Sequence, residues 1–230
     1  MSLAEPIQFA SGSSDEDLAI ALRRLPMFPL PGVVLLPHAL LPLHIFEERY
    51  RAMTRDVLKG ARFLAVSLIA PGEPETAERP AVARVAGVGE VMMAHELADG
   101  RFNLVLRGRA RIRIDAELAT AHPYREIAAS MLPDLPALDG AELRDADQSL
   151  RALVGQLADA IPDGGEILRQ VVAAQETPAE LVDVLTAQLV SDPALRQRLL
   201  ETREIERRIE RVSAEVVALT SRIAPPGPVN

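Results

Sequence analysis

The hydrophobic positions of the 230-residue chain follow two different patterns, and the change between them falls near residue 133. Before that point, apolar runs are short, alternate with polar residues and are interrupted by proline and glycine. After it, apolar residues recur every three or four positions. Alternation is typical of strands, whereas the longer spacing is typical of helices. The pattern therefore predicts a β-rich domain followed by a helical one.

The densest apolar stretch, residues 25–53, reads LPMFPLPGVVLLPHALLPLHIFEERYRAM and holds five prolines. Because proline lacks a backbone donor, it sits at sheet edges, strand starts or bulges. We therefore expect two short strands, at residues 26–30 and 40–45, joined by an apolar loop. An amphipathic helix is expected directly afterwards, because apolar residues recur there at helical spacing. These residues are Phe46, Tyr50, Met53 and Val57.

Four further strands are predicted before residue 133. Gly87 and Gly89 indicate a bulge or bend in one of them, and Asp99-Gly100 is a typical hairpin turn. Six strands bent by glycine and proline, with one helix, suggest a small, partly closed barrel. The four strands are expected at residues 62–69, 81–97, 101–115 and 124–131.

The helical pattern predicts a bundle whose last helix begins at the capping residue Asp192 and runs to about Arg222. The apolar residues of that helix alternate spacings of four and three, as in a heptad seam. The seam either packs within its own bundle or, beyond Glu206, projects and pairs with a partner. Its members are Ile205, Ile209, Val212, Val216, Leu219 and Ile223.

The aromatic residues mark the same division of the chain, since all five phenylalanines and both tyrosines precede residue 125. We therefore expect a loosely ordered lead-in at residues 1–24 and a β-rich domain at residues 25–133. A helical bundle at residues 134–224 and a tail at residues 225–230 complete the chain. The expected fold class is α+β.

No catalytic constellation is recognisable. The chain has no cysteine, and its single lysine, Lys59, stands outside any phosphate-binding loop pattern. A Ser–Lys pair would have to use this lysine at the end of an ordinary amphipathic helix, and no nucleophile-elbow pattern occurs. The histidines lack the spacing of a helical metal site, although His38 and His44 flank the apolar loop and leave a small-molecule site there as an alternative. The sequence indicates no enzyme, no metal and no cofactor.

The net charge and the hydropathy of the chain indicate which classes of partner and which cellular environments are unfavourable. The net charge of −8 disfavours a dedicated nucleic-acid binder, which ordinarily needs a basic surface. The chain starts without the basic and apolar regions of a signal peptide, and it contains no apolar run long enough to span a membrane. A soluble, cytoplasmic protein without a membrane partner is expected.

The first candidate binding site is apolar. The loop between the first two strands is more hydrophobic than an exposed loop ordinarily is, and a Met-Met pair adds adaptable side chains. Exposed apolar loops mark interaction sites, so the expected ligand is a polypeptide. The alternative is that the same residues belong to the core. The site consists of Val33, Val34, Leu35, Leu36, Met92 and Met93.

The second candidate is a row of arginines in the strand at residues 101–115. Strict alternation places Arg107, Arg109, Arg111 and Arg113 on one face. Guanidinium groups in a row suit phosphates or acidic side chains, but no aromatic residue is interleaved for base stacking. An RNA-binding module is therefore the alternative function. A solvated face neutralised by nearby acidic residues is the simpler interpretation.

The proline-rich apolar stretch at residues 25–53 closely resembles the opening signature of the N-terminal, substrate-recognition domain of Lon proteases. Residues Leu25–Leu30, Pro31–Pro37 and Leu41–Tyr50 carry this signature. The resemblance extends over roughly residues 25–220. Further matches are Gly87-Val88-Gly89, Asp99-Gly100, Leu106-Arg107-Gly108, Arg111 to Ile114, Pro123-Tyr124 and, more weakly, Leu199 to Thr202 and Arg207 to Ile209.

The resemblance implies a pseudo-barrel related to the PUA-like fold, followed by a helical bundle that ends in a long helix. It also implies a bacterial, non-catalytic module that recognises unfolded or hydrophobic polypeptide segments as a substrate selector or adaptor. A full-length Lon protease is one candidate partner. The ATPase and peptidase modules of such a protease have no counterpart in these 230 residues, so no proteolytic activity is expected.

Overall fold

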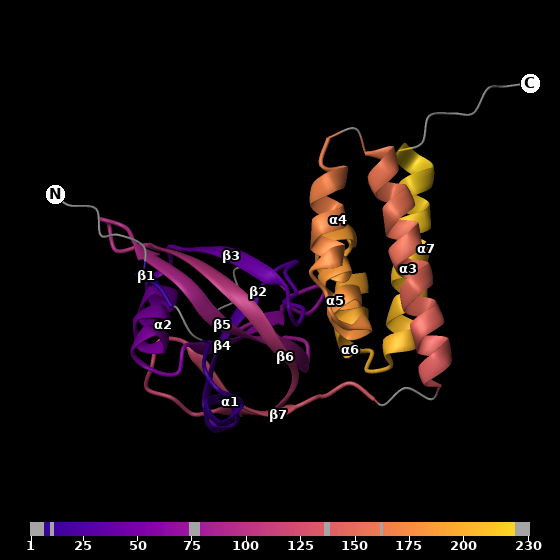
Figure 1. Cartoon of the computed structure of the whole chain (residues 1–230). Helices are drawn as coiled ribbons and strands as arrows, with labels where there is room; N and C mark the ends of the chain where they lie inside the picture. The colour runs from indigo at the N-terminus through magenta and orange to yellow at the C-terminus, as the bar shows by residue number, and fades with distance from the viewer. Residues whose placement is uncertain (1–6, 10–11, 74–78, 136–138, 162, 224–230) are drawn as a thin grey trace, which may run out of the picture. The chain divides into compact units, whose positions relative to one another are not determined.

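The computed structural model describes residues 7–9, 12–73, 79–135, 139–161 and 163–223 of the chain. The chain divides into two compact units, Met1–Pro133 and Asp134–Asn230 (Figure 1). The first unit is built from strands and two helices, and the second is entirely helical in its described residues. The α+β class expected from the sequence is confirmed.

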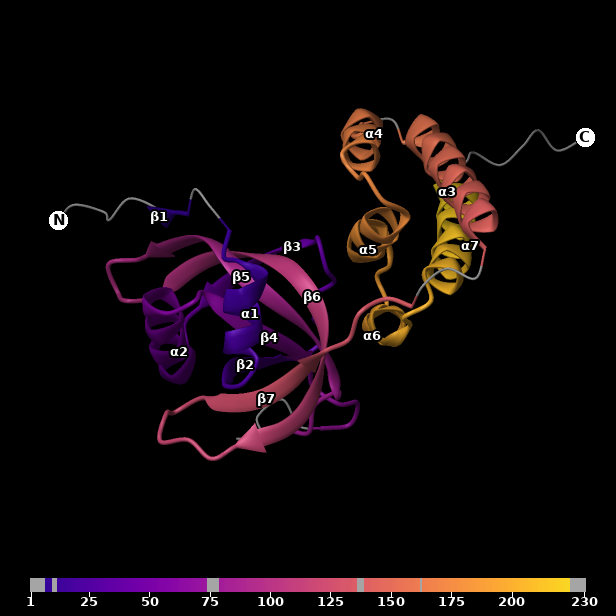
Figure 2. The same cartoon turned by 60° about the horizontal axis from the view of Figure 1, so that its bottom comes forward.

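The strands of the first unit form one sheet in the order β1-β5-β4-β2-β7-β6-β3, and an additional pairing joins β5 to β6. That pairing closes a ring of β5, β4, β2, β7 and β6, which is the predicted barrel (Figure 2). Among the described strand pairs, β2–β4 is parallel and the others are antiparallel. The strands are β1 (Ile7–Gln8), β2 (Leu25–Leu30), β3 (Leu40–Ile45), β4 (Phe63–Leu68), β5 (Val85–Glu96), β6 (Phe102–Leu118) and β7 (Arg125–Met131).

The sheet separates two hydrophobic cores, because successive side chains of a strand point to opposite faces. In β4, Leu64 and Val66 belong to the first core, whereas Phe63 and Ala65 belong to the second. Helix α2 (Glu48–Lys59) covers the first core with Tyr50, Met53 and Val57. The predicted amphipathic helix is thus present, but Phe46, which was expected on its apolar face, precedes it and is exposed.

Part of the segment expected to be loosely ordered is folded, which corrects the sequence-based expectation for residues 12–24. Helix α1 (Asp15–Ala21) starts with a capping box between Ser14 and Asp17, which supplies partners for exposed backbone donors. Its Leu18, together with Leu22, is buried in the second core. Two buried leucines and a capped N-terminus help to hold this short helix on the barrel.

Glu117 near the end of β6 links two elements of the first unit. It forms ion pairs with Arg125, 2.8 Å away at the start of β7, and with Arg79. The hydrogen bonds from Arg125 lower the pKa of the Glu117 carboxyl below its ordinary value, and Arg79 adds to the shift. The charged form is therefore preferred more strongly in the folded protein than in the unfolded chain.

This shift predicts a pH-dependent contribution to stability. A carboxyl group whose pKa is lower in the folded protein stabilises the fold at pH values above its unfolded-state pKa, about 4.3. This contribution disappears as the pH falls through the lower folded-state pKa. Thermal melts of the wild type and Glu117→Gln should differ at neutral pH and converge below pH about 4. A difference that stays constant across this range would contradict the assignment.

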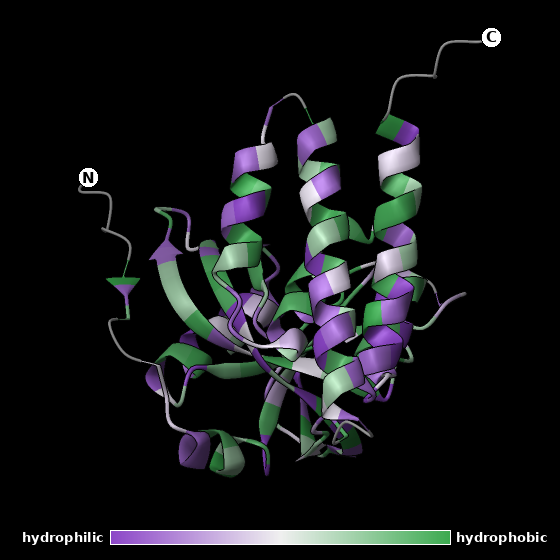
Figure 3. Ribbon diagram, turned by 45° about the vertical axis from the view of Figure 1, so that its right-hand side comes forward, coloured by the Kyte–Doolittle hydropathy of each residue, from purple (hydrophilic) through white to green (hydrophobic). Residues whose placement is uncertain are grey.

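The second unit is a bundle of five described helices. They are α3 (Gly140–Ala160), α4 (Gly165–Ala173), α5 (Pro178–Leu189), α6 (Pro193–Glu201) and α7 (Ile205–Ile223). Hydrophobic and hydrophilic bands alternate along the helices (Figure 3), and the hydrophobic ones meet in a single core. Ile209, Val212 and Val216 of α7 are buried there, so the heptad seam packs within its own bundle. No described helix is long and apolar enough to cross a membrane.

The single long helix expected from Asp192 to about Arg222 is two helices, α6 and α7. The backbone leaves the helical conformation at Thr202 (φ −80°, ψ 116°). The carbonyl oxygen of Thr202 accepts a hydrogen bond of 3.0 Å from the buried Arg208, and the carbonyl of Arg203 accepts one of 3.1 Å from the backbone of Leu135. The break therefore exposes carbonyl groups that tertiary partners use, which no local pattern indicates.

Candidate functional site

The apolar loop expected to be an exposed binding site is largely core. Val34, Leu35 and Leu36 are 7%, 1% and 0% exposed, so the expectation of exposure is wrong for these three residues. Val33 is half-buried and packs against the first core.

The glycines of two strands explain why the loop lies so close to the sheet. A Cβ atom on Gly87 would lie 2.0 Å from the carbonyl oxygen of Leu35, and one on Gly108 would lie 2.0 Å from that of Leu36. Gly108 also exchanges backbone hydrogen bonds with the loop, at 2.9 Å from His38 N–H and 2.8 Å to the carbonyl of Ala39. The loop therefore packs closely against β5 and β6.

The apolar surface of this unit lies instead on β3, the last strand of the sheet. Leu41, Leu43 and Ile45 pack toward the first core, so the alternate residues Leu40, Pro42 and His44 face the other way and are exposed. Leu40 is 61% exposed. Phe46, directly after β3, is 62% exposed and stacks on His44 with ring centroids 6.3 Å apart.

Neighbouring strands extend this surface. The cross-strand row Pro42–Val105–Met93 joins β3, β6 and β5, and residues directly opposite each other share a face. A register shift between Val91 and Met93 leaves Met92 as an extra residue of β5. Both methionines are half-buried. We use the name β3 surface for Leu40, Pro42, His44, Phe46, Met93 and Val105.

The β3 surface has a polar border. The imidazole Nδ1 of His44 lies 2.7 Å from Oδ1 of Asn103, and Nη1 of Arg101 lies 3.4 Å from His44 Nε2. An apolar centre with a polar border is the usual anatomy of a recognition surface. The candidate site expected from the sequence did not include Leu40 and Phe46, because an exposed leucine or phenylalanine is indistinguishable from a core residue in the pattern alone.

The four arginines do not share one face, which corrects the expectation of an arginine ladder. A register shift opposite Val88 and Gly89 leaves Arg109 as an extra residue in β6. As a result, Leu106 packs in the first core whereas Ile112, also at an even position, packs in the second. A one-residue bulge reverses the faces of a strand, so Arg107 and Arg113 lie on opposite sides of the sheet.

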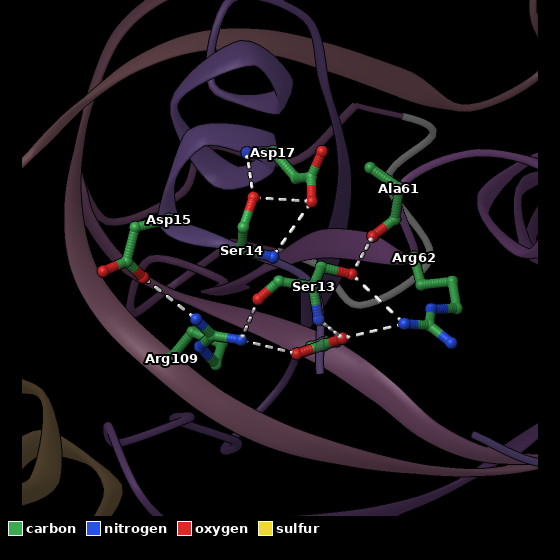
Figure 4. A network of polar contacts seen from close by, with 8 residues as sticks. Ser13, Ser14, Asp15, Asp17, Ala61, Arg62 and Arg109 are labelled. Atoms are coloured by element: carbon green, nitrogen blue, oxygen red, sulfur yellow. Dashed lines mark hydrogen bonds and ion pairs between the residues drawn. The ribbon is translucent and has the colours of Figure 1, made fainter. Parts of the chain in front are cut away.

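Two of these arginines are also engaged within the protein. Arg111 is 4% exposed. Arg109 donates to Glu90 at 2.7 Å and to the carbonyl of Ser13 at 2.9 Å, and it pairs with Asp15 at 3.0 Å (Figure 4). Glu90, which is 1% exposed, also accepts hydrogen bonds from Ser13 and from Arg62. This network ties the start of α1 to the barrel rather than presenting cations to a ligand.

The two histidines that flank the loop are not brought together. His38 bonds to Gly108 of β6, whereas His44 bonds to Asn103, five residues earlier, which is about 17 Å along an extended strand. Within the part of the chain that the structure describes, no group of three or more His, Cys, Asp or Glu side chains is placed to hold a metal ion.

The chain's relatives share this architecture. The family model for the substrate-binding domain of the ATP-dependent protease La (Lon) matches residues 24–217. The chain belongs to the Lon substrate-binding domain family. The resemblance found in the first signature is thus confirmed, and in Lon proteases this domain is a non-catalytic module.

Several Lon proteases are similar to the chain over most of its length. That of Anaeromyxobacter dehalogenans is 23% identical over 86% of this chain and 24% of its own length, and that of Desulfovibrio desulfuricans is 27% identical over 83% and 22%. The chain thus spans about a quarter of the length of the curated relatives it matches.

Solved structures show the same fold. The N-terminal domain of the Mycobacterium avium complex Lon protease has a TM-score of 0.67 at 17% identity, and 84% of this chain and 98% of that chain are covered. A Lon N-terminal domain protein from Xanthomonas campestris has a TM-score of 0.58 at 24% identity, with 83% and 97% covered.

Proposed function

We propose that this Lon-family domain recognises unfolded or hydrophobic polypeptide segments, as a substrate selector or adaptor, through the β3 surface. The family assignment supports recognition of a polypeptide, and the exposure of Leu40 and Phe46 supports the site. Of the six residues expected from the sequence, Met93 remains part of the proposed site. Val34, Leu35 and Leu36 are excluded because a ligand cannot reach them without unfolding the loop.

Side chains, rather than backbone pairing, would provide the affinity. Pro42 stands in the middle of β3, so an added strand cannot form a continuous ladder along this edge. Burying one large apolar side chain contributes about 1.5–3 kcal/mol, so Leu40 and Phe46 together would supply about 3–6 kcal/mol of the roughly 8 kcal/mol that micromolar binding needs. The other residues of the β3 surface would have to supply the rest. A full-length Lon protease is one candidate to receive the bound polypeptide.

The proposal predicts that Leu40→Asp combined with Phe46→Asp weakens binding of a labelled, unfolded casein fragment about 100-fold in fluorescence anisotropy. Wild-type binding should survive high salt, because apolar contacts carry it. Both side chains are exposed, so the variant should fold normally, which the near-ultraviolet circular dichroism of the tyrosines would check.

Ile20→Asp is the matched control. Ile20 is 59% exposed on α1, outside the β3 surface, and its replacement should leave casein binding unchanged. Equal binding by the double variant and the wild type would show that the site lies elsewhere. Binding of a single-stranded RNA probe that disappears as salt rises would instead favour the arginine-based alternative.

A further inference from the structure

A cavity of about 230 Å³ lies on the first unit, between the start of α2 and the β6–β7 loop. It is separate from the β3 surface, with which it shares no residue. Three arginines from different segments line it: Arg49 of α2, Arg79, and Arg125 of β7. Tyr50, His122 and Tyr124 also line it, and none of the lining residues that the structure describes is acidic.

The cations of this cavity are held in place by carboxylates that do not line it. Arg125 is paired with Glu117 and donates to the carbonyl of Pro80 at 2.7 Å. Arg49 pairs with Glu47 at 2.9 Å, and its guanidinium lies 4.6 Å from the centroid of the Tyr50 ring. Cations fixed on the wall of a cavity create a positive potential inside it.

Tyr50 supplies a hydroxyl at the same place. The residue is 6% exposed and lines the cavity. The hydroxyl of Tyr124 donates to Asp56 at 3.0 Å. Burial raises the pKa of Tyr50, so its hydroxyl remains a donor at neutral pH. A hydroxyl on the wall of a cavity can donate a hydrogen bond to a ligand acceptor there.

We propose that this cavity binds a carboxylate group, which accepts a hydrogen bond from the Tyr50 hydroxyl and pairs with Arg49 and Arg79. A singly charged anion suits the site because Glu47 and Glu117 already offset much of the arginine charge. A carboxylate can come from a small organic acid or from a polypeptide, at its C-terminus or on an acidic side chain. The proposal goes beyond the proposed function, and failure of either leaves the other standing because the two sites share no residue.

The test uses the full chain and four probes. Three are labelled, alanine-rich peptides followed by fluorescence anisotropy: one with a free C-terminal carboxylate, one amidated, and one amidated with an internal glutamate. The fourth is sodium propionate, used as a competitor and observed by NMR shifts of the tyrosine rings. A peptide carboxylate should bind roughly tenfold more tightly than the amide, and propionate should compete with it.

Two variants connect the binding to the cavity. Tyr50→Phe removes only the hydroxyl and Arg49→Met removes one cation, and each should weaken carboxylate binding roughly tenfold. Arg55→Met, on the same helix but outside the cavity, should not change it. Binding of propionate without binding of the peptide carboxylates would support the cavity and identify a small acid as the ligand. Unchanged binding in both cavity variants, or equal binding of the amidated peptide, would overturn the proposal.

Discussion

Gly108→Ala is expected to destabilise the first unit by about 3 kcal/mol, at the upper end of the usual cost of overpacking. The new Cβ would lie 2.0 Å from the carbonyl oxygen of Leu36 and 3.1 Å from Cα of Pro37, and both are backbone atoms. The loop cannot move away without losing its hydrogen bonds to the backbone N–H and C=O of Gly108. Side-chain rearrangement therefore cannot relieve the clash.

The effect can be measured on the first unit alone, because both tyrosines lie there and the sequence has no tryptophan. Tyrosine fluorescence during chemical denaturation should show a lower midpoint for Gly108→Ala. Gly60→Ala is the matched control in the same unit, since its Cβ would come no closer than 3.6 Å to a neighbouring atom. Equal midpoints for the two variants would mean that the loop does not pack against β6 as described.

Arg208→Met is expected to destabilise the second unit by about 3–5 kcal/mol, because it leaves buried negative charge without its cation. Arg208 is 0% exposed and donates to the two oxygens of Asp134 at 2.6 and 3.0 Å. It also lies 3.5 Å from Asp183, which is 1% exposed. Burial by itself lowers the pKa of Arg208, but the hydrogen bonds to Asp134 and the charge of Asp183 outweigh it and raise the pKa, so the cation is retained.

The helical signal in far-ultraviolet circular dichroism reports on this unit, which holds five of the seven described helices. Arg207→Met is the matched control: the side chain of Arg207 is 73% exposed, and its loss should cost little. Replacing Asp183 by Leu in the Arg208→Met background should recover part of the stability, because both ends of that pair are then apolar. If Arg208→Met and Arg207→Met melt alike, the buried ion cluster does not hold α7 in place.

Most of the elements could be predicted because their signals are local. The strands near residues 26–30 and 40–45 and the helix after them follow from proline positions and from helical spacing within a few residues. The structure places them at Leu25–Leu30, Leu40–Ile45 and Glu48–Lys59. The break between α6 and α7 was missed because a contact at the break joins distant residues: the backbone of Leu135 donates to the carbonyl of Arg203.

The candidate site was predicted less well, because exposure depends on what packs against a residue. Val34, Leu35 and Leu36 are as hydrophobic as Leu40 and Phe46, yet the first three are buried and the last two are exposed. Nothing within the segment distinguishes the two groups. The difference arises because glycines of distant strands let the loop backbone approach the sheet, while β3 lies at the end of the strand order.

The sequence by itself determined the division into a β-rich and a helical part. It also led to the expectation of a partly closed barrel and, through the signature at residues 25–50, to the family. Each of these depends on periodicity or on a contiguous motif. Only the tertiary structure decided which side chains of the strands and loops are exposed to a ligand. A single bulge residue, Arg109, reverses the faces of β6 and separates arginines that strict alternation places together. Register is set by pairing between distant strands, so a one-residue shift there changes every side chain that follows.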